Sequence, residues 1–449
     1  MTDATSVQSA IATLGPSGWN TVEPAPGARP PVQTLNYTTK RNTSAIIPFM
    51  PQSVATAFTG THNLLMTAPG EFDAVALVAM NADVSAVTWD NAIVAVSERS
   101  DTVASRTVPV VGGTAFNALA AAGTQQGFVP VTWDGGSTST SIPAGTVTTP
   151  TIKLSDWIPL SSIPRVDNTA GFPLVMARVN YVARALSVHV FPNGTEVDTF
   201  NTLMSPYEWY QTAQAVDGVT TPANYTQAWT AGANTQSVRL FGMAFRLRGT
   251  GHLVMACGDS ILRSLAAAGG LASLAASNSL SGWFPLLMKA MASKANPVGF
   301  CNLSVSSKPS ATYTADFKTW AQILKPSVGM IPPYSPNDGA MTVSVSSVSS
   351  NRALDFADWC RDRNILPVVI TPVPYGGSGS ETRRSAFVTK MRALSGVRCL
   401  DVNTPVNDPA NVANNYWTTG SNFDDTHPSA TGHQTIATAR TTDMLSILG

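Results

Sequence analysis

Strand-like and helical segments alternate through the C-terminal part of the chain, and this alternation limits its fold more than any other feature. The strand-like runs are residues 252–257, 298–305, 327–331, 366–371 and 397–402. A helical pattern follows each run, at residues 261–292, 313–324, 351–364, 381–394 and 430–448. Helical crossovers between consecutive strands build a parallel sheet with helices on its faces. We therefore predict an α/β fold with a doubly wound, five-stranded parallel sheet over residues 251–449.

The preceding part of the chain follows a different pattern, in which short β-like runs are broken by turns. Residues 72–78 and 179–190 are two such runs. Short strands with frequent turns are typical of a β-sandwich or jelly roll. Residues 1–35 are rich in Pro and Gly and show no period, which indicates an N-terminal arm or linker. We expect an arm at 1–35, an all-β sandwich or jelly-roll domain at 36–250 and the α/β domain at 251–449.

Composition excludes several classes of protein. Only 12% of the residues are charged, about half of the usual ~25%, and 27 basic residues balance 27 acidic ones. This balance argues against a nucleic-acid partner, and a surface rich in hydroxyls and amides favours an extracellular or virion-associated protein. We find no signal peptide and no apolar run of ~18 residues, so we expect no membrane partner. The four cysteines lack metal-site spacing, so buried free thiols and no metal or cofactor are expected.

Candidate catalytic residues lie where the fold predicts a site, at the carboxyl ends of the strands. The first strand ends at Gly258-Asp259-Ser260, and Asp424 and His427 stand just before the last helix. A serine hydroxyl becomes a nucleophile when a base removes its proton, and His427 can be that base. Asp424, three residues earlier, can fix the imidazole tautomer, with Asp425 as the alternative. Taken alone, Ser260 would be no more than a helix N-cap.

The same strand ends offer hydrogen-bond donors for an oxyanion. Attack on a carbonyl creates a negative oxygen, which is stabilised by donors already aimed at it. The candidates are the backbone N–H of Ser260, the backbone N–H of Ser307 and the side-chain amide of Asn337. Ser306 is the alternative to Ser307.

Other polar and aromatic residues have simpler explanations. We expect His433 on a helix surface or pocket rim and His252 in a structural role, while His62 and His189 lie in the β-rich part without a partner. Four aromatic residues near the strand ends are candidates for binding substrate, with core packing as the alternative: Tyr334, Tyr375, Tyr416 and Trp417.

The GDS serine, the ND asparagine and the C-terminal DxxH, in this order, resemble the sequence blocks of the SGNH hydrolases, the GDSL-like lipase and esterase superfamily. The resemblance covers about residues 250–449. It implies an SGNH-type fold in which Ser260 is the nucleophile, His427 the base, Asp424 its partner and Asn337 an oxyanion donor, with no cofactor or metal.

The family pattern has four blocks: a GDS serine, a glycine after the second strand, a GxND asparagine and a C-terminal DxxH. This chain departs from it at two positions, because serine replaces glycine in the second block at Ser307 and in the third at Ser335. A backbone N–H donates whatever the side chain, so Ser307 can serve if its φ and ψ are tolerable.

The combination with a β-rich domain resembles some carbohydrate esterases. It implies a carboxylic ester hydrolase that removes O-acetyl groups from a carbohydrate through an acyl-serine intermediate, and small esters should also be substrates. The alternatives are a phage tail-associated glycan deacetylase, a glycan-binding or structural protein with an inactive hydrolase domain, and a lipase on longer acyl esters. The sequence leaves the oligomeric state open.

Overall fold

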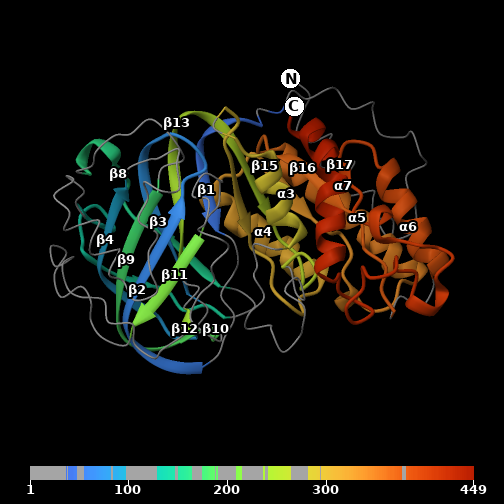
Figure 1. Cartoon of the computed structure of the whole chain (residues 1–449), viewed down its shortest axis with the longest axis horizontal. Coiled ribbons are helices and arrows are strands. Elements are labelled where there is room, and N and C mark those ends of the chain that lie inside the picture. Colours follow the sequence, from blue (N-terminus) through green and yellow to red (C-terminus); the bar gives the residue numbers. More distant parts are fainter. Residues whose placement is uncertain are drawn as a thin grey trace, which may run out of the picture.

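The structure is a computed structural model, shown in Figure 1. It describes residues 37, 39–47, 55–81, 84–97, 129–146, 150–163, 174–187, 189–190, 209–214, 236–237, 241–263, 282–293, 295–376 and 381–449. The predicted arm at residues 1–35 lies outside these ranges, as do residues 264–281 of the predicted first helix.

A parallel sheet forms the centre of the C-terminal part. Its strands run in the order β14 (Val298–Asn302), β13 (Phe241–Ala256), β15 (Val328–Ile331), β16 (Leu366–Ile370) and β17 (Arg398–Leu400). The chain first winds from β13 to β14 and then crosses to β15 on the other side. Ligands of doubly wound sheets bind at the point where the winding reverses, here between β13 and β15. The α/β class with a mostly parallel sheet is confirmed.

Helices cover both faces of this sheet (Figure 1). Val254 and Ala256 of β13 share a core with the helices on one face, whereas Leu253 and Met255 share a core with the helices on the other. The first face is covered by α3 (Trp283–Met291) and α7 (Ala430–Leu448). The second is covered by α4 (Ser310–Leu324), α5 (Val343–Arg361) and α6 (Glu381–Ala393).

The sheet is larger than predicted, with nine strands among the described residues in place of five. The four added strands are β1 (Arg41–Ile47), β3 (Phe72–Asn81), β7 (Thr151–Leu154) and β8 (Ile158–Pro159). Strands β1 and β3 attach because β13 starts eleven residues before His252: its first part pairs antiparallel with β1 and β3, and its last part pairs parallel with β14 and β15. Strands β7 and β8 pair with β3 in turn. The predicted boundary at 250/251 therefore falls inside one strand, and the division into domains stays a prediction.

A second, antiparallel sheet packs against the β3 end of the first. It contains β11 (Trp209–Gln214), β2 (Ala55–Thr67), β9 (Leu174–Ser187), β4 (Val87–Ser97), β5 (Val129–Pro130) and β6 (Ser139–Ile142). The fully buried rings of Trp89 and Trp133 meet edge to face with centroids 5.8 Å apart. They share one core with Leu77 of β3 and Phe245 of β13. The predicted sandwich or jelly roll over residues 36–250 stays a prediction. Two short strands, β10 (His189–Val190) and β12 (Gln236–Ser237), pair separately.

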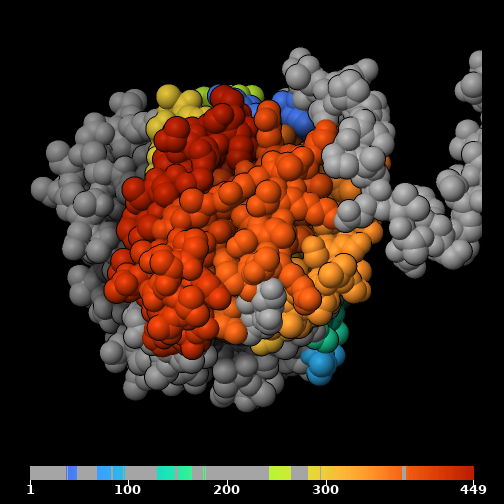
Figure 2. Space-filling model, turned by 90° about the vertical axis from the view of Figure 1, so that its right-hand side faces the viewer, coloured from blue at the N-terminus to red at the C-terminus, as the bar shows by residue number. Residues whose placement is uncertain are grey.

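The C-terminal part dominates the face of the molecule seen in Figure 2, where orange and red residues cover most of the surface. Within the described ranges, no helix combines the length and apolar character needed to cross a membrane. All four cysteines are free, and Cys257, Cys301 and Cys360 are buried, as predicted.

Candidate active site

Ser260 follows the carboxyl end of β13 in a tight turn. The Arg263 N–H donates to the Asp259 carbonyl over 3.0 Å, and the Ile261 N–H donates to the Asp259 carboxylate over 3.0 Å. Gly258 allows this turn, because a Cβ there would lie 2.8 Å from a methyl of Leu262. Ser260 itself stays half-buried, so its hydroxyl is within reach of a ligand.

Ser260, His427 and Asp424 form one line of hydrogen bonds. His427 Nε2 lies 2.8 Å from Ser260 Oγ, and His427 Nδ1 lies 2.8 Å from Asp424 Oδ2. A carboxylate only accepts, so the ring proton belongs on Nδ1 and the Nε2 lone pair faces the serine hydroxyl. Ser260 and His427 lie 167 positions apart in the sequence. The end of β13 and the loop before α7 bring them together.

The Asp424 carboxylate is held in its charged form. Burial raises the pKa of this carboxyl, but hydrogen bonds from the His427 ring and backbone outweigh burial, so its pKa lies below the usual value. Asp425, the alternative partner, does not reach the ring. Its backbone has a left-handed φ of 63°, and its carboxylate accepts from the Asn422 amide over 2.9 Å. Of the two neighbouring carboxylates, the structure brings Asp424 to His427.

His433 corrects one sequence prediction, because it lies neither on the helix surface nor at a pocket rim. It is fully buried on α7, and its Nδ1 accepts from the backbone N–H of Trp283 at the start of α3 over 3.2 Å. The reason is that α7 turns this side towards α3 and the sheet. His252 is structural as predicted: its ring is 1% exposed and bonds the Thr39 carbonyl over 2.9 Å.

The loops after β14 and β15 carry the predicted oxyanion donors. Ser307 is exposed and has a φ of 61°, the left-handed region that favours glycine, and Ser306 does not share this conformation. Asn337 lies in a short 3-10 turn, η6 (Pro336–Asp338), and its Nδ2 donates to the Lys308 carbonyl over 3.2 Å. This hydrogen bond joins the loop after β14 to the loop after β15, next to Ser307.

Asp259 connects these loops to the nucleophile. Its buried carboxylate accepts from the Ser335 hydroxyl over 2.5 Å, and Ser335 is fully buried. Burial raises the pKa of Asp259, although hydrogen bonds from Ser335 and Ile261 act in the opposite direction. This contact was not predicted, because Ser335 lies 76 residues from Asp259 in the sequence.

The predicted substrate-binding aromatics lie mostly in the interior. Trp417 is fully buried and Tyr375 is 7% exposed, and both rings belong to core clusters, so core packing describes their positions. The Tyr334 hydroxyl donates to the Gly339 carbonyl over 2.8 Å and meets the Tyr375 hydroxyl at 2.9 Å. Tyr416 is half-buried, with a left-handed φ of 66°.

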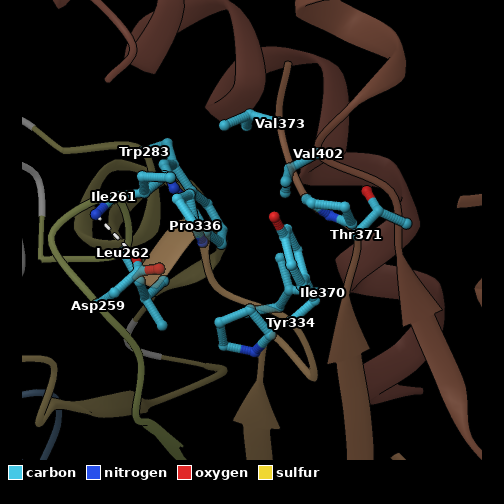
Figure 3. Close-up of a pocket in the computed structure, with 12 residues that line it drawn as sticks. Asp259, Ile261, Leu262, Trp283, Tyr334, Pro336, Ile370, Thr371, Val373 and Val402 are labelled. Carbon is cyan, nitrogen blue, oxygen red and sulfur yellow. Dashed lines mark hydrogen bonds between the residues drawn. The ribbon is translucent and has the colours of Figure 1, made fainter. Parts of the chain in front are cut away.

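An apolar pocket lies beside Asp259 and Ile261 (Figure 3). It encloses about 380 Å³ of empty space, its open mouth included. Both neighbours of Ser260 in the sequence, Asp259 and Ile261, line this space. The opposite wall comes from the ends of β16 and β17, and the full lining is Asp259, Ile261, Leu262, Trp283, Pro332, Tyr334, Pro336, Ile370, Thr371, Pro372, Val373 and Val402. Across the ranges that the structure describes, His, Cys, Asp and Glu side chains nowhere gather in threes that could hold a metal ion.

No family model matches the chain, and no curated protein matches it. Similar solved structures include a GDSL-like lipase from Bacteroides thetaiotaomicron, 12% identical with a TM-score of 0.32 over 43% of this chain and 88% of the lipase. An acetyl xylan esterase is 15% identical with a TM-score of 0.33, over 43% of this chain and 98% of that enzyme. A family-two carbohydrate esterase from Cellvibrio japonicus is 9% identical with a TM-score of 0.34, over 91% of this chain and 98% of that enzyme.

Proposed function

We propose that the protein is a serine esterase that hydrolyses carboxylic esters through an acyl-Ser260 intermediate. The observation that carries this proposal is the continuous hydrogen-bond line from Ser260 Oγ through the His427 ring to the Asp424 carboxylate. Both ring nitrogens of His427 are engaged, Nε2 by a serine hydroxyl and Nδ1 by a carboxylate. A histidine that only faces solvent does not require this arrangement. The arrangement matches the roles of nucleophile, base and orienting acid in acyl transfer.

The reaction proceeds in two halves. His427 Nε2 takes the Ser260 proton as Oγ attacks the ester carbonyl, and the carbonyl π electrons move onto its oxygen. The backbone N–H groups of Ser260 and Ser307 and the Asn337 amide stabilise this oxyanion. The oxyanion then collapses, and the alcohol leaves with the proton from His427. In the second half water gives a proton to His427 and attacks the acyl carbon, which forms a second oxyanion. This oxyanion collapses, the bond to Ser260 Oγ breaks, Ser260 takes the proton from His427, and the carboxylic acid is released.

We infer that the acyl part of the substrate is short. The pocket beside Asp259 and Ile261 is lined mainly by apolar side chains, which favours a hydrocarbon group over a sugar. Its 380 Å³ of empty space includes the gaps between atoms and the open mouth, so the part that a ligand can fill is much smaller. This size supports acetyl or butyryl groups over the long chains of a lipase substrate. An O-acetylated carbohydrate is the substrate that we propose, in an extracellular or virion-associated setting, including a phage tail.

The test is hydrolysis of 4-nitrophenyl acetate by the wild type and the Ser260→Ala variant. We expect Ser260→Ala to lower kcat by at least about 10³-fold, because no nucleophile remains beside His427. Ser349→Ala is the matched control. Ser349 is 1% exposed on α5, and its hydroxyl has no hydrogen-bond partner in the described structure. Equal rates for the wild type and Ser260→Ala would refute the proposal and favour a binding protein with an inactive hydrolase domain.

Acetyl, butyryl and palmitoyl esters of 4-nitrophenol then rank the acyl group. The short-chain proposal predicts that kcat/KM falls from butyryl to palmitoyl. A higher value for palmitoyl would identify a lipase instead. The carbohydrate part of the proposal is tested by the rate of acetate release. The rate on acetylated xylan is compared with the rate on acetylated chitin oligomers.

A further inference from the structure

Ser335 occupies a position where a hydroxyl changes the chemistry of the loop beside Ser260. It is fully buried at the N-cap of η6, and its backbone N–H donates to Asp338 Oδ2 over 2.9 Å. Its hydroxyl donates to the Asp259 carboxylate over 2.5 Å. The same oxygen accepts from the Asn337 backbone N–H over 3.2 Å and from Asn337 Nδ2 over 3.1 Å. A hydroxyl has one donor and two acceptor lone pairs, so these three bonds use its full capacity.

The orientation of the Asn337 amide follows from its two acceptors. Nδ2 lies 3.1 Å from Ser335 Oγ and 3.2 Å from the Lys308 carbonyl oxygen. Those two oxygens are themselves 3.4 Å apart, so the three atoms form a nearly equilateral triangle. The Lys308 carbonyl can only accept, which places Nδ2 rather than Oδ1 on this side.

The Asn337 amide can meet these two oxygens in two ways. Each N–H can donate to one oxygen, or one N–H can lie between both oxygens in a three-centre bond and leave the second N–H over. The second arrangement is the one that leaves a donor for an oxyanion.

Asn337 needs these contacts to keep its side chain in one orientation. It is exposed on a turn of three residues, and a free side chain of this kind samples several rotamers. Donors stabilise a transition state most when they are already in place, because no reorganisation is then required. Ser335 also links this donor to the nucleophile loop, since its acceptor Asp259 directly precedes Ser260.

We propose that Ser335 is a positioning residue for ester hydrolysis, which holds one N–H of Asn337 so that the other faces the oxyanion. The inference rests on the proposed function, because it assumes that Asn337 is an oxyanion donor. Ser335 touches no reacting atom in this scheme, and its effect on kcat passes through Asn337 rather than through its contact with Asp259.

A double-mutant cycle on 4-nitrophenyl acetate hydrolysis tests this proposal. Ser335→Ala should lower kcat about tenfold with KM unchanged, because the Lys308 carbonyl remains as a second holding acceptor and only transition-state stabilisation is lost. Ser335→Gly removes the same hydroxyl without adding a methyl group and should give the same loss. Asn337→Ala should lower kcat about 10²-fold. In the Asn337→Ala background, Ser335→Ala should cost nothing more.

Three outcomes would overturn the proposal. The first is a double-variant loss equal to the product of the two single losses, which would mean that Ser335 acts independently of Asn337. The second is a wild-type kcat in Ser335→Ala, and the third is a loss confined to KM. Thermal unfolding of each variant and the Ser349→Ala control identify losses that come from unfolding. If Ser260→Ala is as active as the wild type, the proposed function itself fails, and that result is separate from the cycle.

Discussion

Replacing Asp424 by asparagine should reverse the proton on the catalytic imidazole. Asp424 Oδ1 accepts from the backbone N–H groups of His427 over 2.8 Å and of Thr426 over 3.2 Å. These donors would keep the single oxygen of Asn on their side. The Asn amide nitrogen would then occupy the Oδ2 position, 2.8 Å from His427 Nδ1. The retained oxygen also lies 2.9 Å from Nδ1, but it already accepts from two backbone N–H groups, so we expect the amide donor to decide the tautomer. Nδ1 then becomes the acceptor and the ring proton moves to Nε2, which faces Ser260 and can no longer accept its proton.

The expected loss is about 10⁴-fold in kcat, or about 5.4 kcal/mol of barrier at 1.36 kcal/mol per tenfold. The assay is steady-state hydrolysis of 4-nitrophenyl acetate near neutral pH. Asp425→Asn is the matched control, since Asp425 contacts Asn422 rather than the ring and its left-handed backbone suits asparagine. We expect this control to stay within a few fold of the wild type. A loss below tenfold in Asp424→Asn, or equal losses in both variants, would refute the tautomer reasoning.

Three further predictions concern the Asp424 carboxylate, the backbone at Ser307 and the pocket. The folded-state pKa of Asp424 lies below its unfolded value of 3.8, so its stabilisation is present above that pH and is lost as the pH falls through the lower folded pKa. The unfolding midpoint of the wild type should therefore fall more steeply than that of Asp424→Asn as the pH drops below 3.8, and parallel curves would contradict the shift. Ser307→Gly should change the free energy of unfolding in urea by less than about 1 kcal/mol, whereas Ser307→Val should cost about 1 to 3 kcal/mol at this left-handed φ; equal effects would contradict the strain. Ile370→Ala should raise the butyryl-to-acetyl ratio of kcat/KM up to about tenfold by enlarging the pocket, and an unchanged ratio would place the acyl group elsewhere.

Local patterns predicted the α/β part well because its signals are local. The last helix was predicted at residues 430–448, the bounds that α7 has in the structure. Helix α5, by contrast, starts eight residues before the predicted 351, at Val343. Its first two turns, VSVSSVSS, combine β-branched and hydroxyl residues with low helix propensity. Thr342 starts this helix by capping the Val345 N–H over 3.1 Å, a contact that outweighs the weak propensity.

Strand pairing was less accessible, because it joins residues far apart in the sequence. The strand-like run at residues 252–257 was predicted. The pairing of Phe245, an earlier residue of the same strand β13, with Val75 of β3 was not predicted. Nothing in the residues before 250 distinguishes a strand of the nine-stranded sheet from a strand of a separate sandwich.

The candidate catalytic residues could be predicted from their spacing in the sequence. The DxxH interval places both side chains on one turn of the loop before α7, and the rule for parallel sheets places Ser260 at the same edge. The link between Asp259 and Ser335 had no sequence signal, since it depends on the exact approach of two loops.

Acylation of Ser260 is the step on which the mechanism depends. Mass spectrometry of the protein after reaction with a fluorophosphonate ester, which traps activated serines, tests it. We expect one adduct per chain, on the peptide that contains Ser260. Labelling should be absent in Ser260→Ala and slowed at least about 10²-fold in His427→Ala, because the base is then missing. An unlabelled wild type, or an adduct on another serine that persists in Ser260→Ala, would contradict the claim.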